Sequence, residues 1–419
     1  MSIATPEKAS IKAWIISMVG GLFFTFYFMQ MAFLNPIADA MSDAFKLSPD
    51  QLGTLTSVYL LAVAIMSLPA GILTDKCRAR PLMLTVLALS IVSLVIMRFV
   101  ESYPALVVLR FLQGLLHGFC LLAALKLASQ WIPSRQMATA SSFIITIGLL
   151  GGAATQPLFL WLFNTFGLAN TFLANAGMGA ALWILFFIIV HDNPAAHSHA
   201  DTTWKQFAQG LKQSLSNIQN SAAGLYVCFL NLPLIIFGTS WGAIYLENTF
   251  GMRGEQGTLV LSMVFFGIMA GSPVAGFISD AFRTRKQLLT WGAFATFLMF
   301  ATLFFLKQPS VTVLAAVFFA IGFISSCQVV AYPMIAESNN PAFTGTALSV
   351  LTTVLMLGNT AGQALFSQAV ATHTVVDATT QLPLYTAGSF TYAVWGMAGV
   401  LIIGGVMAFW FKESFGGTQ

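Results

Sequence analysis

The sequence contains very little charge. Only 8% of its 419 residues are Asp, Glu, Lys or Arg, whereas 57% are hydrophobic. A soluble globular domain carries about 25% charged residues, which cover its surface. A soluble protein this poor in charge would have no polar surface to present to water, so the composition indicates an integral membrane protein. The net charge of +4 gives no reason to expect a nucleic-acid partner.

Cysteine is also scarce, and the four cysteines do not form a recognisable pattern. One lies in a loop and three lie inside apolar stretches: Cys77, Cys120, Cys228 and Cys327. They are far apart, and no CxxC pair is present, so neither a disulfide framework nor a metal site is expected from them. His197 and His199 lie near two aspartates, but a solvated linker explains them better than a metal does. We therefore expect no metal and no cofactor.

Catalytic motifs are missing as well. The sequence contains neither HExxH nor a Ser–His–Asp set, and His117 has no acid nearby in the sequence. A membrane enzyme would need such a cluster near an interface. A sensor usually adds a soluble signalling domain, and none is visible. A membrane enzyme and a sensor remain alternative readings of this sequence.

Long apolar stretches, by contrast, recur along the whole chain. A membrane-spanning helix needs about 20 mostly apolar residues. Twelve stretches meet this condition: 13–37, 52–73, 81–100, 104–128, 137–163, 169–190, 222–246, 257–279, 287–306, 310–335, 343–370 and 385–411. The pattern predicts an all-α membrane protein with twelve transmembrane helices.

The positive residues between these spans are unequally distributed. Twelve spans put both termini on one side of the membrane, and the side richer in Lys and Arg is the cytoplasm. Twelve basic residues lie on the side of the termini: Lys8, Lys12, Lys76, Arg78, Arg80, Arg135, Lys205, Lys212, Arg283, Arg285, Lys286 and Lys412. Four lie on the other side: Lys46, Arg98, Arg253 and Lys307. Both termini are therefore expected in the cytoplasm. Arg110 and Lys126 remain, both within the fourth span.

A polar segment, 191–221, separates the first six spans from the last six. Its sequence "TWKQFAQGLKQSLSNI" repeats apolar residues at steps of three and four, which predicts one apolar stripe on a helix. The stripe comprises Trp204, Phe207, Leu211, Leu215 and Ile218. A helix lying on the cytoplasmic surface of the membrane fits this pattern. We expect three parts: a bundle at 1–190, this linker, and a bundle at 222–419.

One loop sequence occurs twice. "GILTDKCRAR" follows the second span, and "GFISDAFRTR" follows the eighth, 205 residues later. The matched residues are Gly71 and Gly276, Asp75 and Asp280, Arg78 and Arg283, and Arg80 and Arg285. The chain is therefore expected to contain two six-helix repeats in the same orientation, which is a transporter plan.

These features resemble the major facilitator superfamily (MFS). Its loop signature, G-x-x-x-D-[RK]-x-G-[RK]-[RK], is matched at Gly71, Asp75 and Arg80, but Arg78 replaces the second glycine. "RFLQGLLHG" in the fourth span is similar to the R-x-x-x-G signature of the family. The resemblance implies the MFS fold and alternating access. Overall the chain is also weakly similar to nutrient importers of intracellular bacterial pathogens.

The repeated loops suggest a conformational latch. The resemblance implies that Asp75 faces the positive end of span eleven and Asp280 that of span five. Glu337 is the acid placed for Arg283 or Arg285, whereas the first repeat has no such acid. The predicted latch residues are Gly71, Asp75, Arg78, Arg80, Gly276, Asp280, Arg283, Arg285 and Glu337. The alternative is that these charges only set topology.

The fourth span holds the strongest candidates for cargo binding. A charge at the membrane centre costs about 2.5–3.5 kcal/mol, so Arg110 is expected to face protein or water. Gln113, Gly114 and His117 share its helix face. An arginine without an acid partner suits a carboxylate or phosphate on the cargo. Alternatively, Arg110 binds backbone carbonyls and His117 is a packing residue.

Other polar residues lie in spans that line the cavity in the family. The remaining substrate-binding candidates are Tyr27, Gln30, Tyr59, Asn231, Trp241, Gln328, Tyr332, Asn359 and Gln363. Each could instead join helices to one another. Candidates for proton coupling are His117, because imidazole titrates near neutral pH, with Glu247 and Asp39 near the periplasmic mouth. No carboxylate lies mid-membrane, which departs from many proton-driven relatives.

The sequence therefore predicts a secondary active transporter in a bacterial inner membrane. The expected cargo is a small polar metabolite, an amino acid or organic anion, imported with protons. We expect a monomer whose partners are this cargo, membrane lipid and protons. The competing hypothesis is proton-driven export of a drug or siderophore, although the glycine array ending in Gly-Pro that marks such exporters is replaced by "GLLGGAATQPL".

Overall fold

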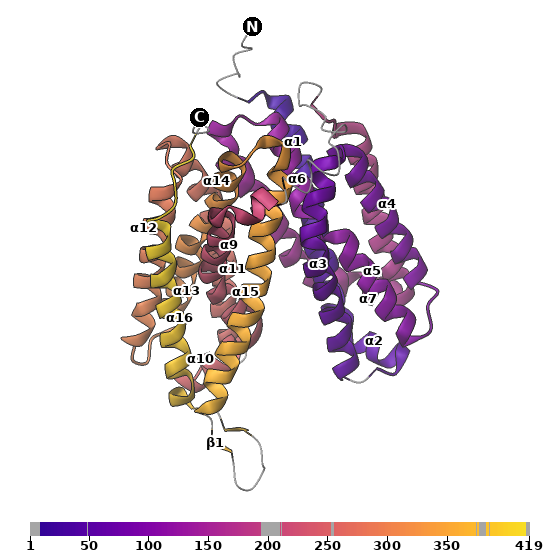
Figure 1. Ribbon diagram of the computed structural model, residues 1–419. Coiled ribbons are helices and arrows are strands. Elements are labelled where there is room, and N and C mark those ends of the chain that lie inside the picture. Colours follow the sequence, from indigo (N-terminus) through magenta and orange to yellow (C-terminus); the bar gives the residue numbers. More distant parts are fainter. Residues whose placement is uncertain are drawn as a thin grey trace. The chain divides into compact units, whose positions relative to one another are not determined.

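The computed structural model describes residues 9–47, 49–193, 210, 212–252, 255–373, 375–376, 383–384 and 386–415. The described chain is almost entirely helical (Figure 1). Twelve helical segments are long and apolar enough to cross a membrane: Ile11–Ala32, Ser57–Lys76, Ala79–Met97, Tyr103–Trp131, Ser134–Thr155, Pro157–Ile189, Ile218–Ile236, Leu259–Ala281, Lys286–Phe304, Val311–Ser338, Thr344–Thr372 and Gly388–Ala408. The prediction of an all-α protein with twelve spans is confirmed.

The chain divides into two compact units. One comprises Met1–Asn217 and Ala336–Thr353, and the other comprises Ile218–Ile335 and Val354–Gln419. The predicted halves, 1–190 and 222–419, stay a prediction; the segment Ala336–Thr353 groups with the first unit because its residues bind Asp75. The stripe predicted for the linker falls largely on residues 194–209 and 211, outside the described part of the chain.

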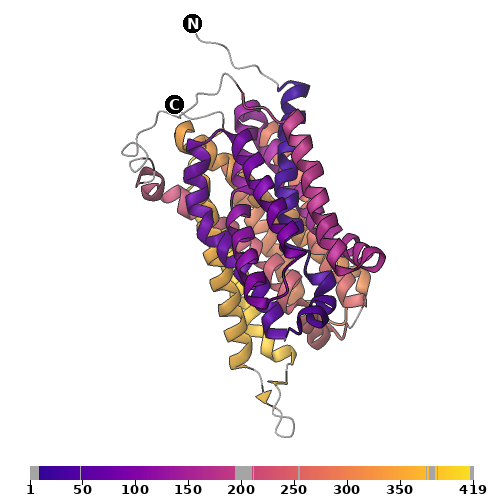
Figure 2. The same ribbon diagram turned by 90° about the vertical axis from the view of Figure 1, so that its right-hand side faces the viewer.

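The described residues of the first unit include seven helices and the first turns of an eighth. These are α1 (Ile11–Ala32), α2 (Ala38–Phe45), α3 (Pro49–Lys76), α4 (Ala79–Met97), α5 (Tyr103–His117), α6 (Cys120–Trp131), α7 (Met137–Ile189) and the start of α15 (Thr344–Thr372). Figure 2 shows the long helices of this unit, in indigo to magenta, running roughly parallel to one another. Such bundles bury the polar backbone of each span inside its own helix, as a membrane requires.

Two spans differ from the sequence prediction for identifiable reasons. The first span ends at Ala32, not near residue 37, because a 3₁₀ turn at Asn35–Ile37 contains Pro36. Helix α7 runs through both the fifth and the sixth predicted spans, 137–163 and 169–190. Gly167, in the left-handed region with φ of +73°, lies at the kink between these two predicted spans. A residue with a Cβ rarely adopts that conformation, so glycine is needed at this bend.

The second unit contains more broken helices. It comprises α9 (Ile218–Ile236), α10 (Gly242–Phe250), α11 (Glu255–Ala281), α12 (Lys286–Ala301), α13 (Val311–Ser325), the start of α14 (Ala331–Ser338), the rest of α15, and α16 (Ala387–Ala408). Between α15 and α16, β1 (Val375–Val376) pairs antiparallel with β2 (Pro383–Leu384). A π-helical turn, Phe237–Trp241, joins α9 to α10, and a 3₁₀ turn, Ser326–Val330, joins α13 to α14.

Glycine sets the closest helix contact in the second unit. A Cβ at Gly267 would clash with the carbonyl oxygen of Phe319, and one at Gly322 would clash with that of Val264. Helices α11 and α13 therefore cross with their backbones nearly touching. Such close approach is how small residues hold helices together where lipid offers no hydrophobic driving force.

Candidate functional site

The candidate site in the first unit begins with a helix crossing at Gly114. A Cβ at this position would clash with the carbonyl oxygen of Tyr59 and lie 2.7 Å from Cβ of Ala62. Only glycine therefore lets α5 approach α3 so closely. The crossing brings the Tyr59 side chain over the polar face of α5. The polar residues of this face lie on both sides of Gly114 in the sequence.

Arg110 is the buried cation of this site. Its side chain is 0% exposed. Nη1 donates to the carbonyl oxygen of Gln30 at 3.0 Å and to Oε1 of Gln113 at 3.1 Å, and Nε donates to the Leu55 carbonyl oxygen at 3.5 Å. The guanidinium carbon lies 4.3 Å from the ring centroid of Tyr59. Two backbone carbonyls, one amide and an aromatic face thus surround the positive charge.

The guanidinium of Arg110 nevertheless keeps one donor unused. Its Nη2 is buried and has no hydrogen-bond partner among the described residues. No carboxylate pairs with it there either, although a buried charge is normally both paired and hydrogen-bonded. Arg110 therefore faces protein and binds two backbone carbonyls, as in the alternative reading, while its Nη2 lacks an acceptor among the described residues.

A chain of amides extends from Arg110 to two neighbouring helices. Gln113 Nε2 donates to Oγ of Ser93 at 3.1 Å. Gln30 and Asn175 exchange two bonds: Nε2 of Gln30 donates to Oδ1 of Asn175 at 2.7 Å, and Nδ2 of Asn175 donates back at 3.1 Å. The sequence analysis missed Asn175 and Ser93. Asn175 could have been found, because it is an amide inside the sixth span.

His117 lies one turn beyond Gln113 and is 2% exposed. Its Nδ1 lies 3.1 Å from the hydroxyl of Tyr59, and its Nε2 lies 3.0 Å from Oγ of Ser90. The Tyr59 hydroxyl also lies 3.4 Å from the carbonyl oxygen of Tyr27. Both ring nitrogens therefore have hydroxyl partners, which can either donate or accept a proton. Arg110, Gln113 and His117 share one buried face, as predicted.

The candidates in the second unit are less connected. Trp241 ends the π-helical turn and donates from Nε1 to Oγ of Ser367 at 2.9 Å. Asn359 has a buried Oδ1 without a hydrogen-bond partner in the described part of the chain. Gln328 lies in the 3₁₀ turn and Tyr332 in α14. Their four-residue spacing therefore does not run along one α-helix. Asn231 and Gln363 are half-buried.

A second polar cluster lies where α3 ends. Asp75 accepts hydrogen bonds from the backbone N–H groups of Gly345 and Thr346, both at 2.7 Å, and from the Thr346 hydroxyl at 2.7 Å. These groups form the first turn of α15, where the helix dipole favours an anion. A Cβ at Gly71 would clash with Ser349, and one at Gly345 would lie 2.7 Å from Oδ1 of Asp75. The contact predicted between Asp75 and span eleven is present.

Lys126 supplies a partner that the sequence analysis did not foresee. Its Nζ lies 3.8 Å from Oδ1 of Asp75 and donates to the carbonyl oxygen of Thr74. The sequence analysis finds no acid in the first repeat that is equivalent to Glu337, and it assigns no role in this contact to the lysine of the fourth span. The partner is instead a lysine that binds the carboxylate itself.

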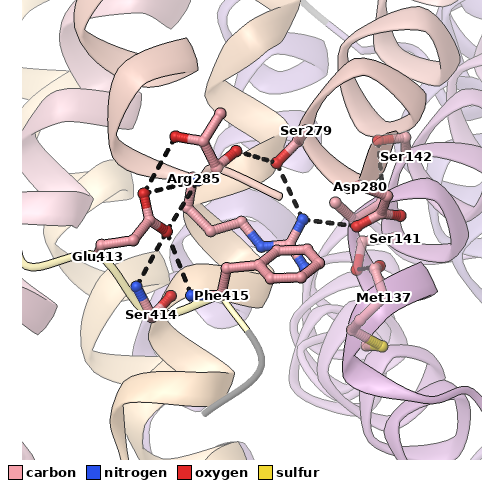
Figure 3. Close-up of polar contacts among 11 residues, drawn as sticks. Met137, Ser141, Ser142, Ser279, Asp280, Arg285, Glu413, Ser414 and Phe415 are labelled. Carbon is pink, nitrogen blue, oxygen red and sulfur yellow. Dashed lines mark hydrogen bonds and ion pairs between the residues drawn. The ribbon is translucent and has the colours of Figure 1, made fainter. Parts of the chain in front are cut away.

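Figure 3 shows the second loop copy, around Asp280 and Arg285. Arg285 is fully buried, and its Nη1 binds Oδ1 of Asp280 at 2.6 Å and Oγ of Ser279 at 2.9 Å. Its guanidinium also lies 4.7 Å from the ring centroid of Phe415. Asp75 thus binds the N-terminus of α15, and Asp280 binds an arginine from its own loop.

Glu413 caps helix α12 in the same cluster. Its carboxylate accepts from the backbone N–H of Arg285 at 2.9 Å and from that of Lys286 at 3.1 Å. The Thr284 hydroxyl and the Phe415 N–H donate to it as well. Burial opposes ionisation of Glu413, but these donors outweigh it and hold its pKa below the ordinary value of 4.5. The segment after α16 thereby closes the loop between α11 and α12.

The remaining predicted residues have more modest roles in the described structure. Arg80 donates from Nη2 to the carbonyl oxygen of Phe187 at 2.7 Å, so it binds the end of α7. Arg78, Arg283 and Glu247 are exposed. Asp39 lies in α2, Gly276 in α11 and Glu337 in α14. The latch and proton-coupling roles of these residues stay predictions, as does pairing of Glu337 with the second loop.

Comparison with known families decides the class of this protein. The Major Facilitator Superfamily profile matches residues 20–253 and 228–415. The chain belongs to the Major Facilitator Superfamily. The two matched stretches together cover most of the chain, as the repeated loops lead one to expect. Its membership makes the chain a multi-pass membrane transporter of the secondary type, not an enzyme.

Three similar transporters share 23–24% identity with this chain over the matched residues. The chain is 24% identical to the uncharacterized transporter YybO of Bacillus subtilis over 67% of this chain and 68% of that one. It is 23% identical to the probable sulfoacetate transporter SauU of Cupriavidus necator, over 68% and 70%, and 24% identical to the probable galactarate/D-glucarate transporter GudP of Bacillus subtilis, over 68% of each.

One solved MFS structure supports the fold over nearly the full length. The proton:xylose symporter XylE, bound to 6-bromo-6-deoxy-D-glucose, superposes with a TM-score of 0.72 at 16% identity. The match covers 97% of each chain. At this identity the likeness concerns the fold, which confirms the predicted MFS architecture.

Proposed function

We propose that this chain is a proton-coupled importer of a small organic anion across the bacterial inner membrane. The observation that carries the proposal is the buried Arg110 guanidinium with its unpartnered Nη2. A carboxylate on the cargo would supply the missing acceptor through a charge-assisted hydrogen bond. It would also neutralise a charge that is expensive to keep in the membrane.

Two further observations favour an anion over a neutral cargo. The names of SauU and GudP assign them sulfoacetate, galactarate and D-glucarate, all organic anions. The amides around Arg110 are also satisfied by one another, as in the Gln30–Asn175 pair. The guanidinium is therefore the group of this cluster that still has a hydrogen-bond donor without an acceptor among the described residues. An amino acid, which carries a carboxylate, belongs to the same chemical class.

Proton coupling is assigned to His117. Among the described residues, one hydroxyl lies within hydrogen-bond distance of each ring nitrogen of His117. The ring can therefore take up a proton and keep both contacts, with the hydroxyl oxygens accepting. It lies on the same face of α5 as Arg110. An anion bound at Arg110 and a proton bound at His117 would therefore favour each other electrostatically, which is the requirement for symport.

A thermal-shift screen tests the proposal. The purified protein is heated with organic acids, amino acids, nucleosides and neutral sugars at pH 5.5 and 7.5, since a ligand that binds the folded state raises the melting temperature. We expect shifts for carboxylates, larger at pH 5.5, and none for neutral sugars. Shifts restricted to bulky hydrophobic compounds or chelators would instead support export of a drug or siderophore.

A further inference from the structure

A pocket of about 470 Å³ lies between the start of α1 and the end of α7. Its walls are isoleucines, among them Ile11, Ile15 and Ile188, and its polar residues are Lys12 and His191. Neither the transport mechanism nor the loop clusters use this pocket. Its volume lies within the range of about 300–1,000 Å³ that is typical of ligand pockets.

The position of the pocket fixes its depth in the membrane. It is lined by the first residues of the span Ile11–Ala32 and the last residues of the span Pro157–Ile189. The pocket therefore lies at the level where hydrocarbon gives way to lipid headgroups. The distribution of Lys and Arg predicts that this level faces the cytoplasm.

The pocket combines exposed apolar walls with an exposed lysine. Ile11 is 80% exposed, Ile15 48% and Ile188 64%, so the walls present apolar surface to whatever surrounds the spans. Ile15 follows Ile11 by about one helical turn and lies on the same face. Lys12 is exposed at the rim, with its Nζ 5.8 Å from the ring centroid of Trp131.

Lys12 brings a positive charge to the lining of the pocket. Asp192 follows His191 directly, but it is outside that lining, and its carboxylate accepts the backbone N–H of Arg80 at 3.2 Å. The pocket itself is lined by no acid among the described residues. A lysine beside an apolar groove near the predicted cytoplasmic surface suits an acidic headgroup, whose phosphate meets the lysine while an acyl chain covers the isoleucines.

We propose that this pocket, formed by Ile11, Lys12, Ile15, Ile188 and His191, binds an acidic phospholipid. The lipid's phosphodiester binds the Lys12 ammonium, and one acyl chain lies along the exposed isoleucines of α1 and α7. The occupant is a membrane lipid and not a free phosphate, because the walls of the pocket are apolar.

Native mass spectrometry of the delipidated full-length protein tests this proposal. The probes are dioleoylphosphatidylglycerol, dioleoylphosphatidylcholine and glycerol 3-phosphate. We expect phosphatidylglycerol to bind in preference to phosphatidylcholine. Lys12→Gln should lower phosphatidylglycerol occupancy about fivefold, since a surface lysine contributes about 1 kcal/mol to acidic-lipid binding. Lys412→Gln is the matched control, because Lys412 is also exposed just beyond the end of a span.

A second variant tests the apolar wall separately. Ile15→Trp fills the groove but keeps Lys12, and it should lower phosphatidylglycerol occupancy as well. Both substituted residues are exposed, so each variant should melt at the wild-type temperature. Three results would each overturn the proposal: unchanged phosphatidylglycerol binding by Lys12→Gln, an equal loss in Lys412→Gln, or displacement of the lipid by glycerol 3-phosphate.

Discussion

The carboxylate of Asp75 lies 2.7 Å from the backbone nitrogen of Gly345, 270 residues further along the chain. Glycines on both sides allow this contact, since a Cβ at Gly71 or Gly345 would meet the opposing helix. Helix α15 continues past this point into the second compact unit. A switch acting at Asp75 could therefore influence a helix that both units share, which is what a latch between two conformational states requires.

Asp75→Asn should weaken this contact. The variant loses the charge that faces the helix N-terminus and Lys126, and a hydrogen bond to a charged group contributes about 1.5–3 kcal/mol. The reporter is a cysteine in place of Ser349, which is buried against Gly71, in a background where the exposed Cys77 is serine. We expect faster labelling by a membrane-impermeant maleimide in Asp75→Asn.

The control for this experiment is Asp192→Asn, which removes a carboxylate that binds a backbone N–H elsewhere in the first unit. It should leave the labelling rate of the Ser349 cysteine unchanged. If Asp75→Asn also leaves the rate unchanged, the latch role is wrong and the loop charges only set topology.

Gly114→Ala should destabilise the first unit. The new methyl group would clash with the carbonyl oxygen of Tyr59, and overpacking of this kind costs about 1–3 kcal/mol. Gly177→Ala is the matched control, because it also lies within a span and its Cβ would meet nothing within 4 Å. Thermal unfolding in detergent should show a lower melting temperature for Gly114→Ala alone. Equal melting temperatures would show that α3 and α5 are not held at this distance.

The sequence predicted the spans well because their length and apolarity follow directly from the membrane. It also predicted the shared face of Arg110, Gln113 and His117, since that depends only on helical periodicity. It did not predict Lys126 beside Asp75, because the contact depends on how two helices pack. Likewise, the two loop copies look alike in sequence, but the capping of α12 by Glu413 comes from a segment far along the chain.

Glu413→Gln should reveal a pH-dependent contribution to stability. The folded-state pKa of Glu413 lies below 4.5, so its carboxylate binds protons less readily in the folded than in the unfolded chain. Its stabilising contribution is therefore fully present above pH 4.5 and is lost as the pH falls through the lowered folded-state pKa. The difference in melting temperature between wild type and Glu413→Gln should therefore shrink as the pH falls below 4.5.

Glu101→Gln serves as the control for Glu413, because Glu101 is exposed at the end of another span. Its melting temperature should follow that of the wild type at every pH. A Glu413→Gln difference that stays constant from pH 7 to below pH 4.5 would contradict the capping of α12 by an ionised carboxylate.

His117→Gln should separate transport from proton coupling. Glutamine can keep hydrogen bonds to the hydroxyls of Tyr59 and Ser90, but it cannot take up a proton. We expect the variant to take up the cargo into proteoliposomes, but a pH gradient should no longer stimulate this uptake. His373→Gln is the matched control, because His373 is exposed and stacks on Tyr392 outside the candidate site. Gradient-stimulated uptake by His117→Gln would exclude His117 as the proton carrier.

The predicted contribution of Arg110 rests on features that sequence alone could only suggest. The residue type and its position in a span pointed to an anion site, whereas the unpartnered Nη2 could be identified only in the folded structure. The candidates in the second unit show where spacing in the sequence is a poor guide to which side chains lie together. Trp241 and Gln328 lie in a π and a 3₁₀ turn, where simple helical spacing does not determine which side chains share a face.

The most direct test of the anion site is counterflow uptake of the best carboxylate from the screen, compared in wild type, Arg110→Lys and Arg110→Ala. Melting temperatures and gel filtration establish that each variant is folded. We predict a loss of at least about tenfold for Arg110→Ala, from a charge-assisted bond of about 1.5–3 kcal/mol. Arg110→Lys should retain part of the activity, because it keeps the charge without the planar fork. Wild-type uptake by folded Arg110→Ala would contradict the account.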